Sequence, residues 1–276
     1  MQGMRVALLG SGWWSLRRDG PAHVISFGDS HVLFDCGRNA VTQLFRVGVS
    51  PAEVSALFIT HGHFDHNLSL VEFLFSSWLS GRTEPVSVYG PKGTRAYVQA
   101  LVGPEGFYAG DIASRTDSSV GMNPEGIRVR ARDVSLSGVV YECPEWKVTA
   151  AAVPHSRFFD SWAYRLDSEA GSVVYSGDTP PSEEVIRLAK GADLLIHECT
   201  GTAAIIREKG LEEFHSSSAD VGAIAREAGV RMVAIVHFGG NGAATSRSVV
   251  RRMAREVRRG FKGRVIVGGD PKIVRI

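Results

Sequence analysis

The order of the predicted elements indicates an α/β fold in which two sheets face each other and helices cover their outer faces. Each half of the chain supplies several β-rich runs followed by helical patterns, and no linker separates the two halves. Two mixed sheets with helices outside satisfy this order within one domain. We therefore expect a four-layer αββα sandwich that forms a single domain over residues 1–276, with two similar halves at about 1–125 and 126–276.

In the first half, apolar runs and turn signals predict strands at 5–9, 23–27, 31–35, 54–60 and 86–90, and helices at 39–47, 68–79 and 91–102. The turn Gly28-Asp29-Ser30 lies between two β-rich runs and signals a hairpin. Pro91 favours the first turn of a helix. Residues 103–125 contain several Gly and Pro residues, so we expect an irregular excursion there with at most a short helix.

In the second half, the same patterns predict strands at 127–132, 146–153, 161–166, 172–176, 193–197, 232–237 and 264–267, and helices at 181–190, 218–228 and 246–259. These strands are short and apolar, and the helical segments between the later ones are long enough to cross over a sheet. Like the first half, the second half therefore supplies several strands and then helices.

Composition narrows the class of protein. With 276 residues, 44% hydrophobic and 22% charged, the chain can bury a large core and is globular. A net charge of +2 implies no obligatory polyanion partner. No basic N-terminal region precedes a long apolar stretch, and no apolar run approaches membrane length, so we expect a soluble cytoplasmic protein without a membrane partner.

Cys36, Cys143 and Cys199 are far apart, which favours free thiols over disulfides or a thiolate zinc site.

Residue types that bind metals are concentrated in one short segment, His61-Gly62-His63-Phe64-Asp65-His66, as in a metal-binding motif. It packs three imidazoles and a carboxylate into six residues, directly after an apolar run. Extended backbone sends alternate side chains to the same side, so His61 and His63 can bind one ion while Asp65 and His66 face a second. Imidazole and carboxylate form the zinc ligand set. One loop therefore predicts two metal sites.

Three later residues follow predicted strands at the points where functional groups can converge on one sheet edge. They are His155, Asp178 and His237. Taken singly, a His or Asp at a strand end is more often a capping residue or a polar residue on the surface. Together with the histidine loop, they are better explained as further metal ligands.

The chain resembles the metallo-β-lactamase superfamily over nearly its whole length. The resemblance rests on the HGHFDH segment, His155, Ser176-Gly177-Asp178-Thr179 and His237. The resemblance implies that His61, His63, His155 and Asp178 hold one Zn²⁺, and that Asp65, His66, Asp178 and His237 hold another, with Asp178 bridging. Mn²⁺ or Fe²⁺ are alternatives. Asp35 matches an early aspartate of the family, which would orient a ligand or the loop without touching metal; a simple turn aspartate before Gly37 is the alternative.

A narrower resemblance is to the ribonuclease Z branch. It rests on Gly10-Ser11-Gly12 with Arg17-Arg18-Asp19-Gly20, on the His-Glu motif within 194–200, and on His215-Ser216-Ser217. In that branch the histidine and glutamate motifs form a dyad near the leaving group. The resemblance implies that His215 donates a proton and that Glu198 orients it. The alternative is that His215 only precedes the cap of the helix at 218.

Two departures from the branch favour a small substrate. Only 22 residues separate His155 from Asp178, too few for the long tRNA-clamping arm, and Phe238-Gly239-Gly240-Asn241-Gly242 replaces a polar phosphate-binding segment. Trp13 and Trp14 are candidates to line an apolar substrate pocket, although core packing is an equal alternative, and Arg17 is a candidate phosphate contact.

Basic residues cluster near the C-terminus with one acid, Glu256, among them. They are Arg247, Arg251, Arg252, Arg255, Arg258, Arg259, Lys262 and Arg264. A helix over this segment would turn the apolar residues to the core and the arginines outward. We interpret them as a solvated face; a nucleic-acid footprint is the alternative.

We therefore predict a dinuclear zinc hydrolase acting on phosphodiesters, with a metal-bridging hydroxide as nucleophile and Asp65, His215 and Glu198 as the catalytic groups. An arylsulfatase-like or lactonase-like small-ester hydrolase is the first alternative, and a non-catalytic metal-binding module the second. The substrate would be a small-molecule or nucleotide ester, with nucleic acid less favoured. The family resemblance also implies a homodimer.

Overall fold

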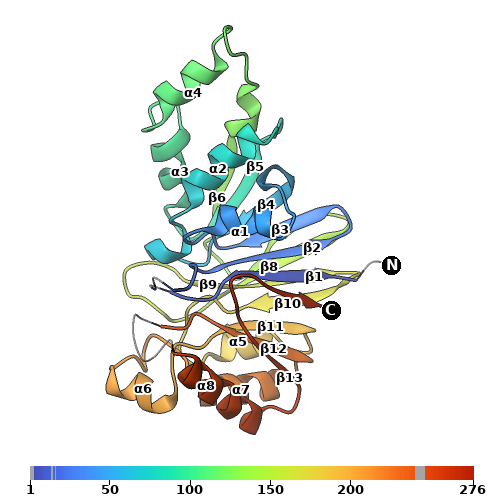
Figure 1. The fold of residues 1–276 in the computed structure, drawn as a ribbon, viewed down its shortest axis with the longest axis vertical. Coiled ribbons are helices and arrows are strands. Elements are labelled where there is room, and N and C mark those ends of the chain that lie inside the picture. Colours follow the sequence, from blue (N-terminus) through green and yellow to red (C-terminus); the bar gives the residue numbers. More distant parts are fainter. Residues whose placement is uncertain (1–2, 14, 16, 240–245) are drawn as a thin grey trace.

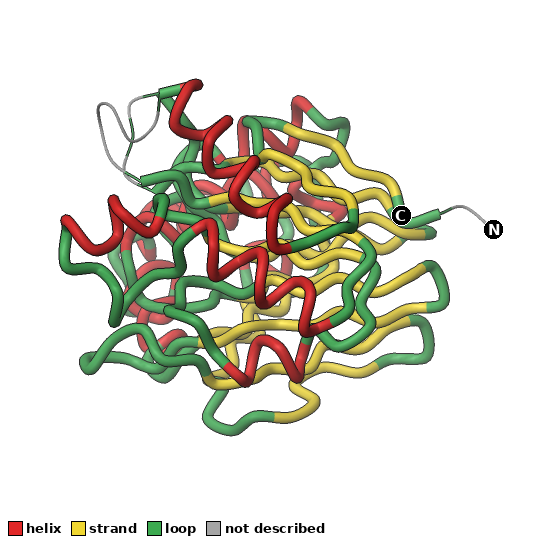
Figure 2. The backbone as a smooth tube through the Cα atoms, turned by 90° about the horizontal axis from the view of Figure 1, so that it is seen from below, coloured by secondary structure: helices red, strands yellow, loops and turns green. Residues whose placement is uncertain are grey.

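The computed structural model describes residues 3–13, 15, 17–239 and 246–276, and it forms two seven-stranded sheets that face each other (Figure 1). Helices lie on the outer face of each sheet, and the view from below in Figure 2 shows helices lying across the strands. The predicted α/β sandwich of two facing mixed sheets with helices outside is confirmed.

The first sheet carries both ends of the described chain. In spatial order it contains β14 (Lys272–Arg275), β1 (Arg5–Gly10), β2 (Ala22–Phe27), β3 (Ser30–Phe34), β4 (Val54–Phe58), β5 (Val86–Gly90) and β6 (Val129–Asp133). Its helices are α1 (Ala40–Arg46), α2 (Leu70–Leu79), α3 (Thr94–Val102) and α4 (Ala109–Thr116). Buried residues of α1, α2 and α3 pack with those of the strands in one apolar cluster, whereas α4 buries none of its residues and projects at the top of Figure 1.

The second sheet has the spatial order β13 (Arg264–Val267), β12 (Met232–Val236), β11 (Leu194–Glu198), β10 (Gly171–Tyr175), β9 (Trp162–Ser168), β8 (Trp146–Ala152) and β7 (Gly138–Glu142). Its helices are α5 (Glu183–Leu188), α6 (Ala203–Glu208), α7 (Ser218–Ala228) and α8 (Arg247–Gly260). The strands β10 to β13 run parallel, so β10, β11 and β12 end at one edge of the sheet. That edge is where the connecting loops can bring side chains together.

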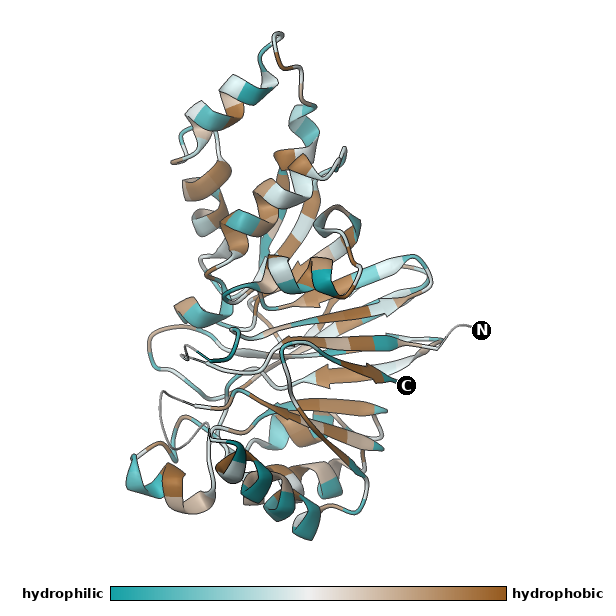
Figure 3. Cartoon of the chain, viewed as in Figure 1, coloured by the Kyte–Doolittle hydropathy of each residue, from teal (hydrophilic) through white to brown (hydrophobic). Residues whose placement is uncertain are grey.

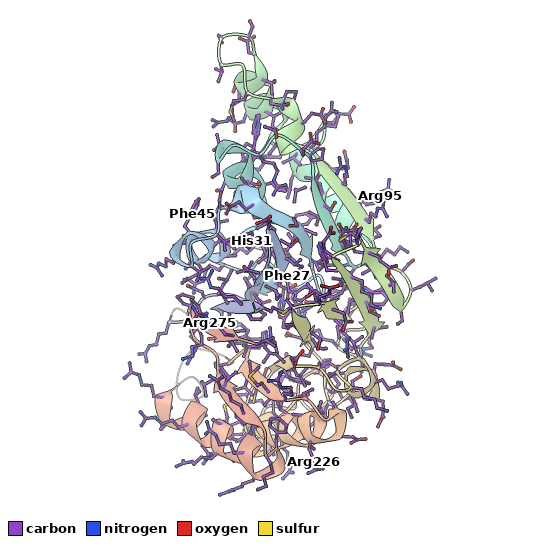
Figure 4. All side chains as sticks on the ribbon, turned by 90° about the vertical axis from the view of Figure 1, so that its right-hand side faces the viewer. Phe27, His31, Phe45, Arg95, Arg226 and Arg275 are labelled. Carbon is purple, nitrogen blue, oxygen red and sulfur yellow. The ribbon has the colours of Figure 1, made fainter. Side chains whose placement is uncertain are left out.

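Aromatic rings fill the space between the sheets. The rings of Phe34 and Tyr164, from opposite sheets, stack with centroids 5.9 Å apart and planes 7° apart. Phe27 packs edge-on against Trp146 and lies inside the sandwich, whereas the labelled Arg226 of Figure 4 lies in the outer helical layer. Figure 3 shows the same division, because the strands are largely brown and the outward side of α8 is teal. This core holds both sheets rigid behind the loops.

Three elements were not predicted: β7, α6 and β14. β7 is half exposed along its length, so it lacks a strong apolar signal, and β14 forms by pairing with β1 at the far end of the chain. No local pattern reports a pairing of such long range. The helix predicted to open at Pro91 begins instead at Thr94, because Gly93 adopts a left-handed turn with φ of 100°. The division between the sheets does not follow residue 125, since β6 and β14 join the first sheet.

Other predictions for the chain can be compared directly with the structure. The hairpin around Gly28 forms as expected, with Phe27 paired to Ser30, and the excursion at 103–125 contains the short helix α4 and the start of a 3-10 helix, Pro124–Ile127. Cys36, Cys143 and Cys199 are free thiols, two of them buried. Among the helices of the described residues, none has the length and apolarity needed to cross a membrane.

Candidate metal centre

The predicted ligands lie on loops that leave the two sheets at one edge. The histidine loop follows β4 and includes a short 3-10 helix, Phe64–His66. His155 follows β8, Asp178 follows β10 and His237 follows β12. Strands from both sheets are therefore needed to bring these side chains together.

Four of the predicted ligands form one group. The Nε2 atom of His61 lies 3.0 Å from Nδ1 of His63, and Nε2 of His155 lies 3.1 Å from that same Nδ1 atom. Asp178 Oδ2 is 3.8 Å from Nε2 of both His61 and His155. This group is the one expected from the alternation of side chains along the loop, joined by His155 and Asp178.

The other predicted ligands form a second group beside the first. His66 Nε2 lies 3.4 Å from His237 Nε2 and 3.6 Å from Asp65 Oδ2. Asp178 reaches this group too, with Oδ1 3.5 Å from His66 Nε2 and Oδ2 3.1 Å from His237 Nε2. The carboxylate of Asp178 thus lies between the two groups.

The hydrogen bonds around the cluster hold four of its imidazoles with Nε2 facing inward, whereas His63 presents Nδ1. The carboxylate of Asp35 accepts from His66 Nδ1 at 2.7 Å and from the backbone N–H of Thr60 at 2.7 Å. The hydroxyl of Thr60 donates to Asp35, so it accepts from His61 Nδ1 at 3.0 Å. Because Nδ1 carries the proton, the lone pair of Nε2 is free to bind a cation.

The remaining imidazoles are held in the same way. His155 Nδ1 donates to the carbonyl of Phe214 at 2.8 Å. The hydroxyl of Thr200 donates to Glu198 and accepts from His237 Nδ1 at 3.2 Å. His237 has a φ of 60°, a left-handed conformation that is uncommon outside glycine. The loop thus adopts an unfavourable backbone shape where it presents this side chain.

The donor set fits divalent cations. Asp65 Oδ2 and Asp178 Oδ1 are buried and accept no hydrogen bond from the described residues, which is costly for a carboxylate without a cation. Burial, with the charge of nearby His66, holds the pKa of His61 well below its usual range, and burial also lowers the pKa values of His63 and His155. Neutral imidazoles and ionised carboxylates are the forms that bind metal.

The predicted pair Glu198 and His215 lies beside this cluster. His215 Nδ1 is 3.0 Å from Glu198 Oε1, and the buried carboxylate also accepts from the backbone N–H groups of Thr179, Thr200 and Ser216. Burial opposes charge on the His215 imidazole, but Glu198 outweighs it and raises the pKa of His215 to about 9. The structure therefore pairs these two residues as expected. The ring of His215 stacks on that of His237, with centroids 5.6 Å apart.

Of the predicted substrate contacts, one lies beside the metal cluster, one is exposed and one lies outside the described residues. Trp13 lies edge-on to both His215 and His237, with ring centroids 6.0 Å apart in each case. Trp14, with Gly240, Asn241 and Gly242, lies outside the described residues. Arg17 is exposed, and its backbone N–H donates to Ser15 Oγ at 3.1 Å. Its neighbour Arg18 is the residue that turns inward.

Three residues of the site were not predicted from the sequence: Thr60, Thr200 and Phe159. Thr60 and Thr200 adjoin predicted motifs, so their position next to a ligand or to the His-Glu motif could have marked them. Phe159 stacks on His61 with centroids 5.7 Å apart and lies edge-on to His63 at 4.8 Å. Nothing in the local sequence distinguishes it from any other loop aromatic.

Comparison with known proteins agrees with this geometry. Residues 30–238 match the family model described as a beta-lactamase superfamily domain. A ribonuclease Z of Mycobacterium avium is 30% identical over 278 residues, covering 97% of this chain and 96% of that protein. The metallo-beta-lactamase fold protein YhfI of Bacillus subtilis superposes with a TM-score of 0.76 at 20% identity, covering 99% of each chain. The short form of human tRNase Z superposes with a TM-score of 0.72 at 20% identity, covering 98% of each chain. The chain belongs to the beta-lactamase superfamily and, within it, to the ribonuclease Z family of metal-dependent hydrolases.

Proposed function

We propose that the protein is a zinc-dependent phosphodiesterase of ribonuclease Z type that uses two Zn²⁺ ions. The observation that carries this proposal is the pair of adjacent donor groups that meet at Asp178. His61, His63, His155 and Asp178 would hold one ion, and Asp65, His66, His237 and Asp178 the other. Two such cations would lower the pKa of a bound water towards about 7 and would neutralise charge on a phosphoryl oxygen.

The side chains beside the ions would have different chemical roles. Asp65 keeps one oxygen without a hydrogen bond, so it can accept a proton at the centre as well as bind metal. His215 presents Nε2 as the proton donor to the departing oxygen, and Glu198 holds the ring through Nδ1. Trp13 borders both His215 and His237 and would form one wall of the substrate pocket.

We infer that a phosphodiester of RNA is the favoured substrate. The preference for a small substrate rested in part on the missing arm between His155 and Asp178. The ribonuclease Z of Mycobacterium avium aligns over 278 residues with this 276-residue chain, so it has no long insertion either. The missing arm therefore does not argue against RNA. Trp13, as an apolar wall, still favours the arylsulfatase-like or lactonase-like alternative.

The experiment compares turnover of four substrates by protein reconstituted with zinc: bis(p-nitrophenyl) phosphate, p-nitrophenyl sulfate, a homoserine lactone and a tRNA transcript with a 3′ extension. We expect both phosphodiesters to be cleaved and two equivalents of zinc by elemental analysis. Hydrolysis of the sulfate or the lactone alone would select the alternative. No turnover of any substrate with the metal complement intact would favour a non-catalytic module.

The homodimer implied by the family stays a prediction. Sedimentation velocity on the zinc-loaded protein would test it, and a single monomeric species across micromolar concentrations would contradict it.

A further inference from the structure

A groove lined by arginines lies between α8 and the N-terminal loop. It encloses about 460 Å³ and is lined by Arg18, Arg247, Arg251, Arg255 and Arg258 with the apolar residues Val250, Ala254 and Val267. None of the described lining residues is acidic. We call this feature the arginine groove. Figure 3 shows α8 as one of the most hydrophilic surfaces of the second half, while its inner side packs on the sheet.

The four arginines of α8 form one stripe. Their spacing of four, four and three residues keeps Arg247, Arg251, Arg255 and Arg258 on one face of the helix. With a rise of about 1.5 Å per residue, the stripe is roughly 16 Å long. A nucleic-acid duplex presents one phosphate about every 3.4 Å along each strand, so the stripe can follow roughly five phosphates.

Several other exposed arginines of the molecule pair with carboxylates. Arg231 pairs with Asp193 at 2.6 Å, Arg128 with Glu125 at 2.6 Å, and Arg187 with Glu184. No carboxylate in the described part of the chain forms an ion pair with any of the four arginines of the stripe. Glu256, the acid on the same helix, instead accepts a hydrogen bond from Ser218 of α7. Like charges so closely spaced on a helix are destabilising unless an anion lies between them.

Arg18 links the arginine groove to the segment that carries His237. Its guanidinium lies 4.6 Å from the ring centroid of Phe238 and donates to Ser11 Oγ at 2.7 Å. Phe238 directly follows His237, and its backbone N–H donates to the carbonyl of Ser11 at 2.8 Å. Because β12, α8 and β13 form a parallel crossover, α8 also begins at the edge of the sheet where His237 lies. A chain held in the groove would therefore reach the metal centre.

We propose that the arginine groove binds the sugar-phosphate backbone of the RNA substrate, away from the scissile bond. The proposal rests on the proposed function and extends it to a second contact surface. A second copy of the chain fits poorly, since a twofold contact would bring two such stripes together. A lipid surface fits poorly because Val250, Met253 and Val257 are buried against the sheet and offer no free apolar face.

The test is the binding of a fluorescein-labelled mature tRNA transcript, measured by anisotropy over a range of salt concentrations. We expect Arg251→Ala/Arg255→Ala to weaken binding on the order of tenfold at 150 mM salt. The slope of log affinity against log salt should become shallower by about 1.4 to 1.8, the value for two lost phosphate contacts. The matched control is Arg252→Ala/Arg259→Ala, which removes the same charge from the same helix outside the groove, and it should change affinity less than threefold.

Equal losses of tRNA affinity in the two double variants, or no loss in the groove variant, would overturn the proposal. Groove-dependent binding of phosphatidylserine vesicles without binding of tRNA would also overturn it. Turnover of bis(p-nitrophenyl) phosphate should be unchanged in both variants, which shows that the fold and the metal centre are intact. If the protein hydrolyses no phosphodiester but the groove variant still loses tRNA binding selectively, the proposed function fails while the arginine groove stands as a nucleic-acid site.

Discussion

The metal centre and the neighbouring Glu198–His215 pair lie at the same edge of the sheets, but their polar groups are satisfied in opposite ways. In the metal centre, imidazole lone pairs face one another at 3.0 to 3.4 Å, and Asp178 Oδ1 accepts no hydrogen bond. In the pair, Glu198 is buried and accepts several hydrogen bonds from the chain itself. The first region is incomplete without cations, whereas the second already holds its proton. This difference separates the candidate metal ligands from the hydrogen-bonded pair beside them.

The largest effect should come from the metal centre. Asp178→Ala removes the carboxylate that both donor groups share, so zinc content should fall well below two equivalents. We expect kcat/KM on bis(p-nitrophenyl) phosphate to fall about 10³-fold or more, because several kcal/mol of charge stabilisation are lost. Elemental analysis and initial rates check this. Asp160→Ala, at an exposed position near His155, is the control and should change neither value. Full zinc content with a normal rate in Asp178→Ala would remove Asp178 from the centre.

The pair should respond through the leaving group and leave the metal content unchanged. For His215→Ala we expect kcat to fall about 10²-fold or more on a diester with an alkoxide leaving group, the usual contribution of a positioned acid. The rate with a p-nitrophenolate leaving group, which needs little protonation, should change only a few-fold. Zinc content should stay at the wild-type value. Equal losses on both substrates would show that His215 is no proton donor.

The groups that hold the imidazoles should have intermediate effects. Asp35→Asn weakens the acceptor that keeps His66 Nδ1 protonated, so we expect zinc affinity to fall about 10- to 100-fold. Titration with a competing chelator measures this affinity, and saturating zinc should restore most of the activity. Asp29→Asn, in the hairpin turn at the opposite end of β3, serves as the control. An unchanged zinc affinity in Asp35→Asn would mean that the hydrogen bond to His66 does not tune the centre.

The smallest effect is in the pH profile. Since the pKa of His215 is raised to about 9, the acid form is present below that pH and is lost as pH rises through it. Bound cations would lower this pKa, so the rate on a poor leaving group should decline at or below pH 9, by about tenfold per pH unit. The decline should be absent in His215→Ala. A wild-type profile that is flat to pH 10 would contradict the assignment.

Local sequence patterns were sufficient for most of the sheets and for the chemistry of the centre. The histidine loop and the strand-end residues His155, Asp178 and His237 could be found because ligand types and strand ends are both local signals. The strands β7 and β14 could not, because one is half exposed and the other depends on pairing with β1 across the whole chain. Arg18 was no better marked than Arg17, although only Arg18 turns towards Ser11 and Phe238.

By itself, the sequence determined which residue types are available to bind metal and in what order along the chain they occur. The tertiary structure alone decided that Asp178 lies between the two donor groups, that Thr60 and Thr200 hold His61 and His237, and that Arg18 lines one groove with the arginine stripe of α8. The physical reason is that coordination and electrostatic interactions depend on distances of a few ångströms between residues far apart in the chain. Those distances are set only when the two sheets pack together.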